Sequence, residues 1–113
     1  MKLIAHRGAS GSFPENTLAS FRAALAAGAE AVEFDVQRAR DGRLAVLHDT
    51  DLRRLAGRKS KVGKLDFAEL SSLDVGSWFD RRFQAERVPS LEEVLDLLPG
   101  GVEVHLEIKQ ARP

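Results

Sequence analysis

The stretch Ala31-Val32-Glu33-Phe34-Asp35-Val36-Gln37 decides the fold, because its apolar and polar residues alternate strictly. Successive side chains of a β-strand point to opposite faces. One face therefore carries Val32, Phe34 and Val36, and the other carries Glu33, Asp35 and Gln37. In a simple half-exposed strand the polar face would meet water. In a closed barrel the apolar face packs on helices and the polar face lines the mouth of the lumen.

A strand and a helix precede this stretch. Leu3-Ile4-Ala5 predicts a short buried strand, and a loop of small residues follows from Gly8 to Pro14. Asn16 or Thr17 can cap a helix that ends near Gly28. Three apolar residues at helical spacing predict that helix: Leu18, Phe21 and Leu25. The order strand, helix, strand is typical of an α/β fold with a parallel sheet and helices packed outside it.

A hairpin is predicted directly after the central stretch. Asp41-Gly42 is a strong turn signal, and the apolar run 44–48 follows it too closely for a parallel crossover. With Asp41-Gly42 as a two-residue turn, Asp35 faces His48 across an antiparallel pair. Opposed residues have Cβ atoms about 5 Å apart, so His48 is expected beside the acidic residues.

The middle of the chain gives weaker signals. Residues 50–66 are polar, and we interpret them as a solvated loop rather than a phosphate-attracting one. The basic residues of that segment are Arg53, Arg54, Arg58, Lys59, Lys61 and Lys64. A short helix is expected over 66–74. Trp78, Phe79 and Phe83 form an aromatic cluster, for which we favour a core or interface role over a substrate wall.

A second helix and a last strand are predicted near the C-terminus. Ser90 and Glu93 fit a capping box for a helix over 90–98, which Pro99-Gly100-Gly101 ends. Residues 102–109 alternate again, and they predict a strand. The apolar residues of the two alternating strands are expected to pack outward on helices: Val32, Phe34, Val36, Val104 and Ile108.

Composition narrows the range of functions. The chain has 113 residues, 43% of them hydrophobic, which suffices for one packed domain. Its formal net charge of zero gives no indication of nucleic-acid binding. The absence of cysteine excludes disulfides and thiolate chemistry. The apolar run before His6 is too short for a signal-peptide core or an integral membrane segment, so we expect a cytoplasmic protein.

Three carboxylates at strand ends form a candidate metal site. Glu33 and Asp35 point the same way from one strand, and Glu107 ends another apolar strand. Taken alone, the pair Glu33 and Asp35 fits exposed carboxylates on an edge strand better than a metal site. With Glu107, three oxygen ligands and no thiolate suit a hard divalent cation, Mg²⁺ or Ca²⁺.

Two histidines and two basic residues complete the candidate site. His6 and His48 follow strands and titrate near neutral pH, so they are the natural acid and base. Arg7 and Lys109 can hold phosphate oxygens, or they can form salt bridges to the carboxylates. His105, on the same face as Glu107, is expected to be a hydrogen-bonded residue that fills the lumen.

The ordered motifs resemble a known enzyme family. They are His6-Arg7-Gly8, Pro14-Glu15-Asn16-Thr17, Glu33-Phe34-Asp35-Val36, Asp41-Gly42, His48-Asp49 and Leu106-Glu107-Ile108-Lys109. Their order and spacing resemble the glycerophosphodiester phosphodiesterases over essentially the whole chain. The segments Leu73 to Phe83 and Val88 to Val94 also resemble that family.

The resemblance implies a fold, an activity and residue roles. The fold is a TIM-barrel-like α/β fold, and the activity is metal-dependent hydrolysis of glycerophosphodiesters to glycerol 3-phosphate and an alcohol. His6 and His48 are implied as the acid–base pair. Arg7 and Lys109 are implied to contact the substrate phosphate. The implied metal ligands are Glu33, Asp35 and Glu107. Glu15 matches a motif position near the site.

Length and alternatives set further expectations. A complete (β/α)₈ barrel needs about 250 residues, so residues 1–113 are expected to be the truncated N-terminal portion of one such domain. Open sheet edges then predict self-association. Two other functions remain open at this point. One is a phosphodiester-cleaving barrel of the sphingomyelinase D type, and the other is a non-catalytic remnant that binds metal or phosphate.

Overall fold

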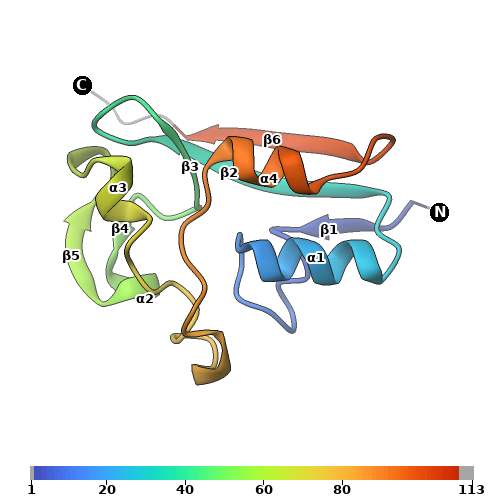
Figure 1. Ribbon diagram of the computed structural model, residues 1–113, viewed down its shortest axis with the longest axis horizontal. Coiled ribbons are helices and arrows are strands. Elements are labelled where there is room, and N and C mark those ends of the chain that lie inside the picture. The colour runs from blue at the N-terminus through green and yellow to red at the C-terminus, as the bar shows by residue number, and fades with distance from the viewer. Residues whose placement is uncertain (1, 110–113) are drawn as a thin grey trace.

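The main sheet has four strands, with β2 at its centre. A computed structural model describes residues 2–109 of the chain. Strand β2 (Ala31–Arg38) pairs in parallel with β1 (Ile4–His6) and β6 (Glu103–Lys109), and antiparallel with β3 (Leu44–Val46). The strands β1 and β3 share one edge of β2, because β6 occupies the other edge along residues 31–37. Figure 1 shows these strands across the upper part of the molecule.

Two helices cover one face of this sheet. Helix α1 (Leu18–Ala26) and helix α4 (Leu91–Leu97) pack on the even-numbered side chains of β2, as the alternation predicts. The rings of Phe21 and Phe34 meet edge to face with centroids 5.4 Å apart. The buried members of this first core are Phe21, Val32, Phe34, Val36, Val46 and Val94. The opposite face of β2 carries Glu33 and Asp35, on the side away from both helices.

Both helices begin at the predicted caps. The Thr17 side chain accepts a hydrogen bond from the Ser20 amide, and the Ser20 side chain accepts one from the Thr17 amide. Ser90 and Glu93 form the same reciprocal pair before α4. Each capping box satisfies amides that a helix N-terminus would otherwise leave unpaired. Within residues 2–109 no helix has the length and apolar character to cross a membrane, and the cytoplasmic location stays a prediction.

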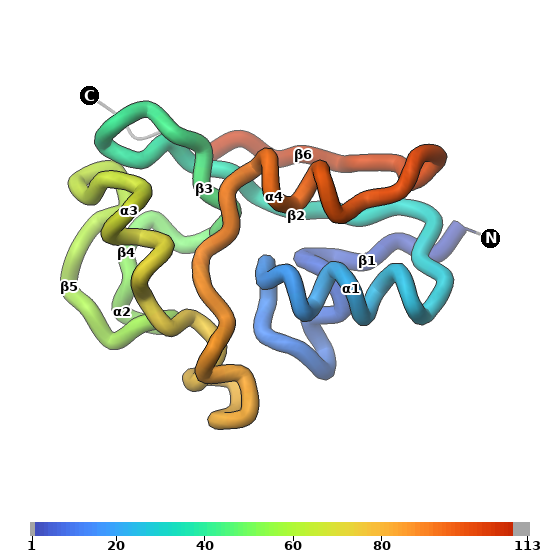
Figure 2. Tube along the Cα trace, in the orientation of Figure 1, coloured from blue at the N-terminus to red at the C-terminus, as the bar shows by residue number. Residues whose placement is uncertain are grey.

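The interpretation of residues 50–66 as a solvated loop is wrong. This segment folds into β4 (Asp51–Leu52), helix α2 (Arg53–Ala56), β5 (Arg58–Lys61) and a 3₁₀ turn (Val62–Lys64). Helix α3 (Phe67–Leu70) follows, within the helix predicted over 66–74. Apolar residues among the basic ones are buried in a second core: Leu52, Leu55, Val62, Leu65, Phe67 and Leu70. In Figures 1 and 2 this unit lies at the left, on the side to which β1 and β6 point.

The predicted hairpin exists, but its register differs by one residue. Val36 pairs with Val46 and Arg38 with Leu44, so the loop has three residues, Arg40 to Gly42, instead of two. The Ala39 amide donates to the Arg43 carbonyl, and Gly42 has φ 88°. A three-residue loop with its last residue left-handed is a common hairpin form. The prediction that Asp35 faces His48 is therefore wrong, and His48 lies beyond the end of β3.

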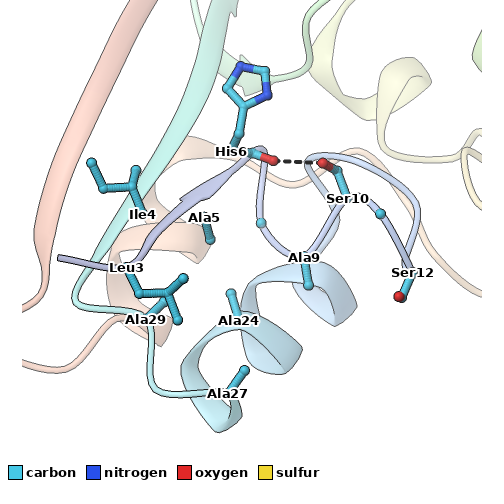
Figure 3. A pocket seen from close by; sticks show the side chains of 12 residues that line it. Leu3, Ile4, Ala5, His6, Ala9, Ser10, Ser12, Ala24, Ala27 and Ala29 are labelled. Atoms are coloured by element: carbon cyan, nitrogen blue, oxygen red, sulfur yellow. Dashed lines mark hydrogen bonds between the residues drawn. The ribbon is translucent and has the colours of Figure 1, made fainter. Parts of the chain in front are cut away.

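The outer strands are more exposed than predicted. The first strand is Ile4–His6 rather than Leu3–Ala5, and Leu3 and Ile4 are 51% and 46% exposed. An apolar groove of about 300 Å³ lies along this strand, beside Ala24, Ala27 and Ala29 (Figure 3). On β6, Val104 and Ile108 were expected to pack on helices but are 37% and 62% exposed. Helices α1 and α4 cover β2 and leave this face of β6 uncovered.

The loop between β1 and α1 depends on a glycine. Gly8 is buried and has φ 79°, a left-handed conformation that side chains with a Cβ disfavour. A Cβ at Gly8 would clash with the Ser20 side chain and lie 2.8 Å from the Ser20 carbonyl carbon. Ser20 is the capping-box residue of α1, so Gly8 lets the loop close against the start of the helix.

We predict that Gly8→Ala lowers the free energy of unfolding by about 2–4 kcal/mol, from left-handed strain plus overpacking. Chemical denaturation monitored by circular dichroism measures this difference. Gly11→Ala is the matched control from the same loop, because a Cβ there would meet nothing within 4 Å. Equal stability of the two variants would contradict the proposed closure.

Candidate active site

Three carboxylates converge at the end of the central strands. Glu33 and Asp35 extend from the face of β2 opposite the helices, and the parallel register places Glu107 of β6 beside Asp35. One oxygen from each of the three groups lies within 4.8 Å of the other two. Asp35 is 1% exposed and Glu33 is half-buried, whereas Glu107 is exposed. Two strands thus bring together the three residues predicted as metal ligands.

The donor set fits a hard divalent cation. Glu33 Oε1 and Asp35 Oδ1 are buried and accept no hydrogen bond from the described residues. Buried polar atoms are almost always partnered, so two unpartnered oxygens in one cluster fit a positively charged ligand. Carboxylates this close also repel one another unless a proton or a cation intervenes. Oxygen ligands of this kind suit Mg²⁺ or Ca²⁺.

Arg7 and Asn16 reach the buried carboxylate from the loop after β1. Arg7 Nε lies 3.5 Å from Asp35 Oδ2, and Asn16 Nδ2 donates to the same oxygen at 3.3 Å. Both residues have left-handed backbones, with φ 56° and φ 58°, and the Asn16 amide donates to the Arg7 carbonyl. Strained residues of this kind cluster at functional sites. We predicted Asn16 only as a cap. Its tolerance of the left-handed region was the available signal.

His6 lies at the end of β1, next to Glu33. Their pairing across the sheet places His6 Nε2 3.5 Å from Glu33 Oε1. The ring is 65% exposed, and Figure 3 shows it pointing away from the apolar groove. Ser10 Oγ donates to the His6 carbonyl at 2.8 Å, which fixes the backbone at this position. An exposed ring beside a carboxylate can accept and release protons.

His48 is placed by Gln37, a residue that sequence reasoning missed. Gln37 Nε2 donates to the carbonyls of Leu47 and Asp49, at 3.0 and 2.6 Å, on either side of His48. His48 Nδ1 in turn lies 3.1 Å from Asp49 Oδ1. The alternation of β2 gave the signal, because a buried amide on the acidic face needs partners.

Lys109 and His48 line a common depression. It has a volume of about 370 Å³ and is lined by His48, Asp49, Thr50, Asp51 and Lys109. Lys109 Nζ donates to Glu107 Oε1 at 3.1 Å, and this hydrogen bond holds the pKa of Glu107 below its usual value. A positive charge on His48 acts on the pKa of Glu107 in the same direction, more weakly.

The remaining predicted residues lie outside this cluster. His105 is hydrogen-bonded, as expected, but its partner is Glu103 at 2.8 Å. Its side chain is 43% exposed, so in the described residues it fills no lumen. The aromatic cluster forms, with Phe79 contacting both Trp78 and Phe83 through ring centroids 5.7 and 6.0 Å apart. Phe13, from the loop after β1, joins it at 5.4 Å from Phe83.

Known proteins resemble this chain in sequence. A glycerophosphodiester phosphodiesterase of Bacillus altitudinis is 40% identical over 112 residues, which cover 97% of this chain and 46% of that protein. A protein of the same name from Caldanaerobacter subterraneus is 41% identical over 109 residues, covering 95% of this chain and 44% of its own length. The chain thus spans about half the length of the curated relatives it matches.

Solved structures agree in fold. A phosphodiesterase of Oleispira antarctica, in complex with the product sn-glycerol-3-phosphate, matches with a TM-score of 0.92 and 38% identity, covering 98% of this chain and 45% of that one. A glycerophosphodiester phosphodiesterase of Agrobacterium tumefaciens matches at 0.91 and 41%, covering 96% and 47%. These matches confirm the partial TIM-barrel-like α/β fold predicted from the sequence. The sequence model of the glycerophosphoryl diester phosphodiesterase family matches residues 6–112, and the chain belongs to that family.

Proposed function

We propose that the protein hydrolyses glycerophosphodiesters to glycerol 3-phosphate and an alcohol, with the aid of Mg²⁺ or Ca²⁺. The observation that carries this proposal is the convergence of Glu33, Asp35 and Glu107 with two unpartnered buried oxygens. The names of the relatives and the product held by the Oleispira antarctica protein support the same substrate class. The position of residues 1–113 as the N-terminal portion of one domain stays a prediction.

Each functional side chain has a role that its surroundings suit. Glu33, Asp35 and Glu107 would hold the cation, which when bound acts as a Lewis acid on a phosphoryl oxygen. Arg7 and Lys109 would contact the other phosphate oxygens, although each also pairs with a carboxylate in this structure.

The two histidines would act as acid and base. One takes the proton from the attacking hydroxyl as its oxygen bonds to phosphorus. The other gives a proton to the leaving alkoxide as the P–O bond to that oxygen breaks, so that bonds and protons balance. His6 contacts Glu33, and His48 lines the depression with Lys109. The two rings therefore come from different segments of the chain.

Metal dependence follows from the carboxylate cluster. We predict that EDTA abolishes turnover of glycerophosphocholine by the protein at its full natural length, and that Mg²⁺ or Ca²⁺ restores it. Asp35→Asn and Glu107→Gln should weaken cation binding in calorimetry by more than about tenfold, since even an indirect partner of a metal costs 10–100-fold. Glu103→Gln is the control, because it changes an exposed carboxylate of the same strand outside the cluster.

The same measurements separate the competing functions. Choline release from sphingomyelin without glycerophosphocholine turnover would favour the sphingomyelinase D type of activity. Cation binding without turnover of either substrate would favour a non-catalytic metal-binding protein. Turnover that is insensitive to EDTA would contradict the proposed use of a cation.

The acid–base assignment predicts a different pattern. His6→Ala and His48→Ala should each lower kcat by roughly 10²–10⁴-fold, the range for a lost general acid or base, with cation affinity unchanged. His105→Ala, which removes the third histidine at an exposed position, should leave kcat within about threefold of the wild type. Wild-type turnover in either of the first two variants would remove that histidine from the mechanism.

Self-association of the chain is a further prediction. Within residues 2–109, β6 pairs on one edge only, and Val104, Leu106 and Ile108 are exposed on it. Unpaired edges beside exposed apolar side chains favour pairing with another chain. Light scattering of the 113-residue chain should show a mass that rises with concentration. Ile108→Lys should reduce that rise, and a monomer at every concentration would contradict this prediction.

A further inference from the structure

Arg54 joins two carboxylates at the edge of the proposed site. Its Nε and Nη2 donate to the two oxygens of Asp49, at 2.9 and 3.1 Å. Its Nη1 and Nη2 donate to the two oxygens of Glu15, at 2.9 and 3.0 Å. Both pairs are bidentate, the geometry in which a guanidinium binds carboxylates most strongly and with the best-defined direction.

The second core fixes Arg54 in this position. Arg54 lies in α2, between Leu52 and Leu55, whose side chains are 0% and 5% exposed. Its guanidinium also stacks over the Trp78 ring, 5.0 Å from the centroid. The side chain is therefore held at its base by buried neighbours and at its tip by a ring and two carboxylates. The β4–α2–β5 unit thus supplies a guanidinium to the segments that follow β1 and β3.

A metal ion is the alternative to Arg54 as the partner of Glu15 and Asp49. Glu15, His48 and Asp49 each place a ligand atom within 4.8 Å of the other two. The guanidinium already satisfies both carboxylates there, and no oxygen of either residue is buried without a partner among the described residues. The cluster thus differs from that of Glu33, Asp35 and Glu107, where two buried oxygens are unpartnered.

Arg54 keeps Asp49 ionised and fixed in orientation. Its hydrogen bond is the largest cause that holds the pKa of Asp49 below its usual value, and a hydrogen bond from His48 acts in the same direction. An ionised carboxylate can only accept hydrogen bonds. Since Asp49 Oδ1 lies 3.1 Å from His48 Nδ1, the proton of the neutral ring belongs on Nδ1. The Nε2 atom of His48 is then free to accept a proton.

We propose that Arg54 is a positioning residue for His48, which it orients through Asp49. The proposal rests on the proposed function, in which His48 transfers a proton. The same guanidinium is also linked to Arg7, the proposed phosphate contact. Glu15 bridges the two, because its Oε2 accepts from Arg7 Nη1 at 3.2 Å as well as from Arg54. Arg54 thereby couples the segment that holds His48 to the loop that holds Arg7.

Kinetics of three variants at the full natural length of the protein test this role. Arg54→Gln should lower kcat about 10–100-fold with KM within threefold, because a misplaced group loses rate rather than affinity. Arg54→Lys should stay at least about tenfold below the wild type, since a single ammonium replaces the fork. Arg53→Gln is the matched control in the same helix and should behave as the wild type. A raised KM with normal kcat, or full activity in Arg54→Lys, would overturn the proposal.

Nitrogen NMR of histidine-labelled protein gives a second readout that needs no activity. At a pH where the ring is neutral, His48 of the wild type and of Arg53→Gln should carry its proton on Nδ1. Arg54→Gln should shift the ring toward the Nε2-protonated tautomer, in a spectrum whose other signals show a folded protein. An unchanged tautomer in Arg54→Gln would overturn the proposal. Absent turnover in the wild type would count against the proposed function alone, because the tautomer measurement still decides the role of Arg54.

Discussion

The parallel pairing of β2 with its neighbours is the constraint on which the site depends. That register places Asp35 beside Glu107 and His6 beside Glu33. A slip of one residue on β2 would turn Glu33 and Asp35 toward the helices and Phe34 toward the site. The burial of Val32, Phe34 and Val36 against α1 and α4 prevents this slip, because it ties the apolar face to the helices. The stability of the first core thus fixes the geometry of the acidic face.

The alternation of β2 therefore carried most of what the sequence could predict. It gave the strand, its two faces and the side on which Glu33 and Asp35 meet. The alternation of β6 added Glu107 in the same way. Capping boxes gave the starts of α1 and α4, since Thr17 and Ser90 each pair with a residue only three positions further along the chain. Local chemistry and strand periodicity were sufficient for these features.

Features that depend on contacts between distant segments were not predictable in the same way. The hairpin register turned on whether the loop has two or three residues, and Asp41-Gly42 is compatible with both. The second core was hidden because Leu52, Leu55 and Val62 are spread among basic residues in elements of two to four residues. Arg54 could not be told from its basic neighbours, because its partners Glu15 and Asp49 come from separate loops. Exposure of β6 reflects the absence of a helix over it within residues 2–109, which no pattern inside the strand encodes.

Charge balance connects the cluster of Glu33, Asp35 and Glu107 with the cluster of Glu15, His48 and Asp49. Five carboxylates gather at the site, from Glu15, Glu33, Asp35, Asp49 and Glu107. Among the described residues, the basic side chains paired with them are Arg7, Arg54 and Lys109. With the histidines neutral, two negative charges remain uncompensated, and burying such charges is costly unless a partner neutralises them. Arg54 and Arg7 together balance the charges of Glu15 and Asp49, and Lys109 balances that of Glu107. The deficit therefore falls on Glu33 and Asp35, where the unpartnered oxygens lie. A single divalent cation bound there would balance these two charges. Because Arg54 of the β4–α2–β5 unit pairs with Glu15 and Asp49, the cluster of Glu33, Asp35 and Glu107 is the place where such a cation would bind.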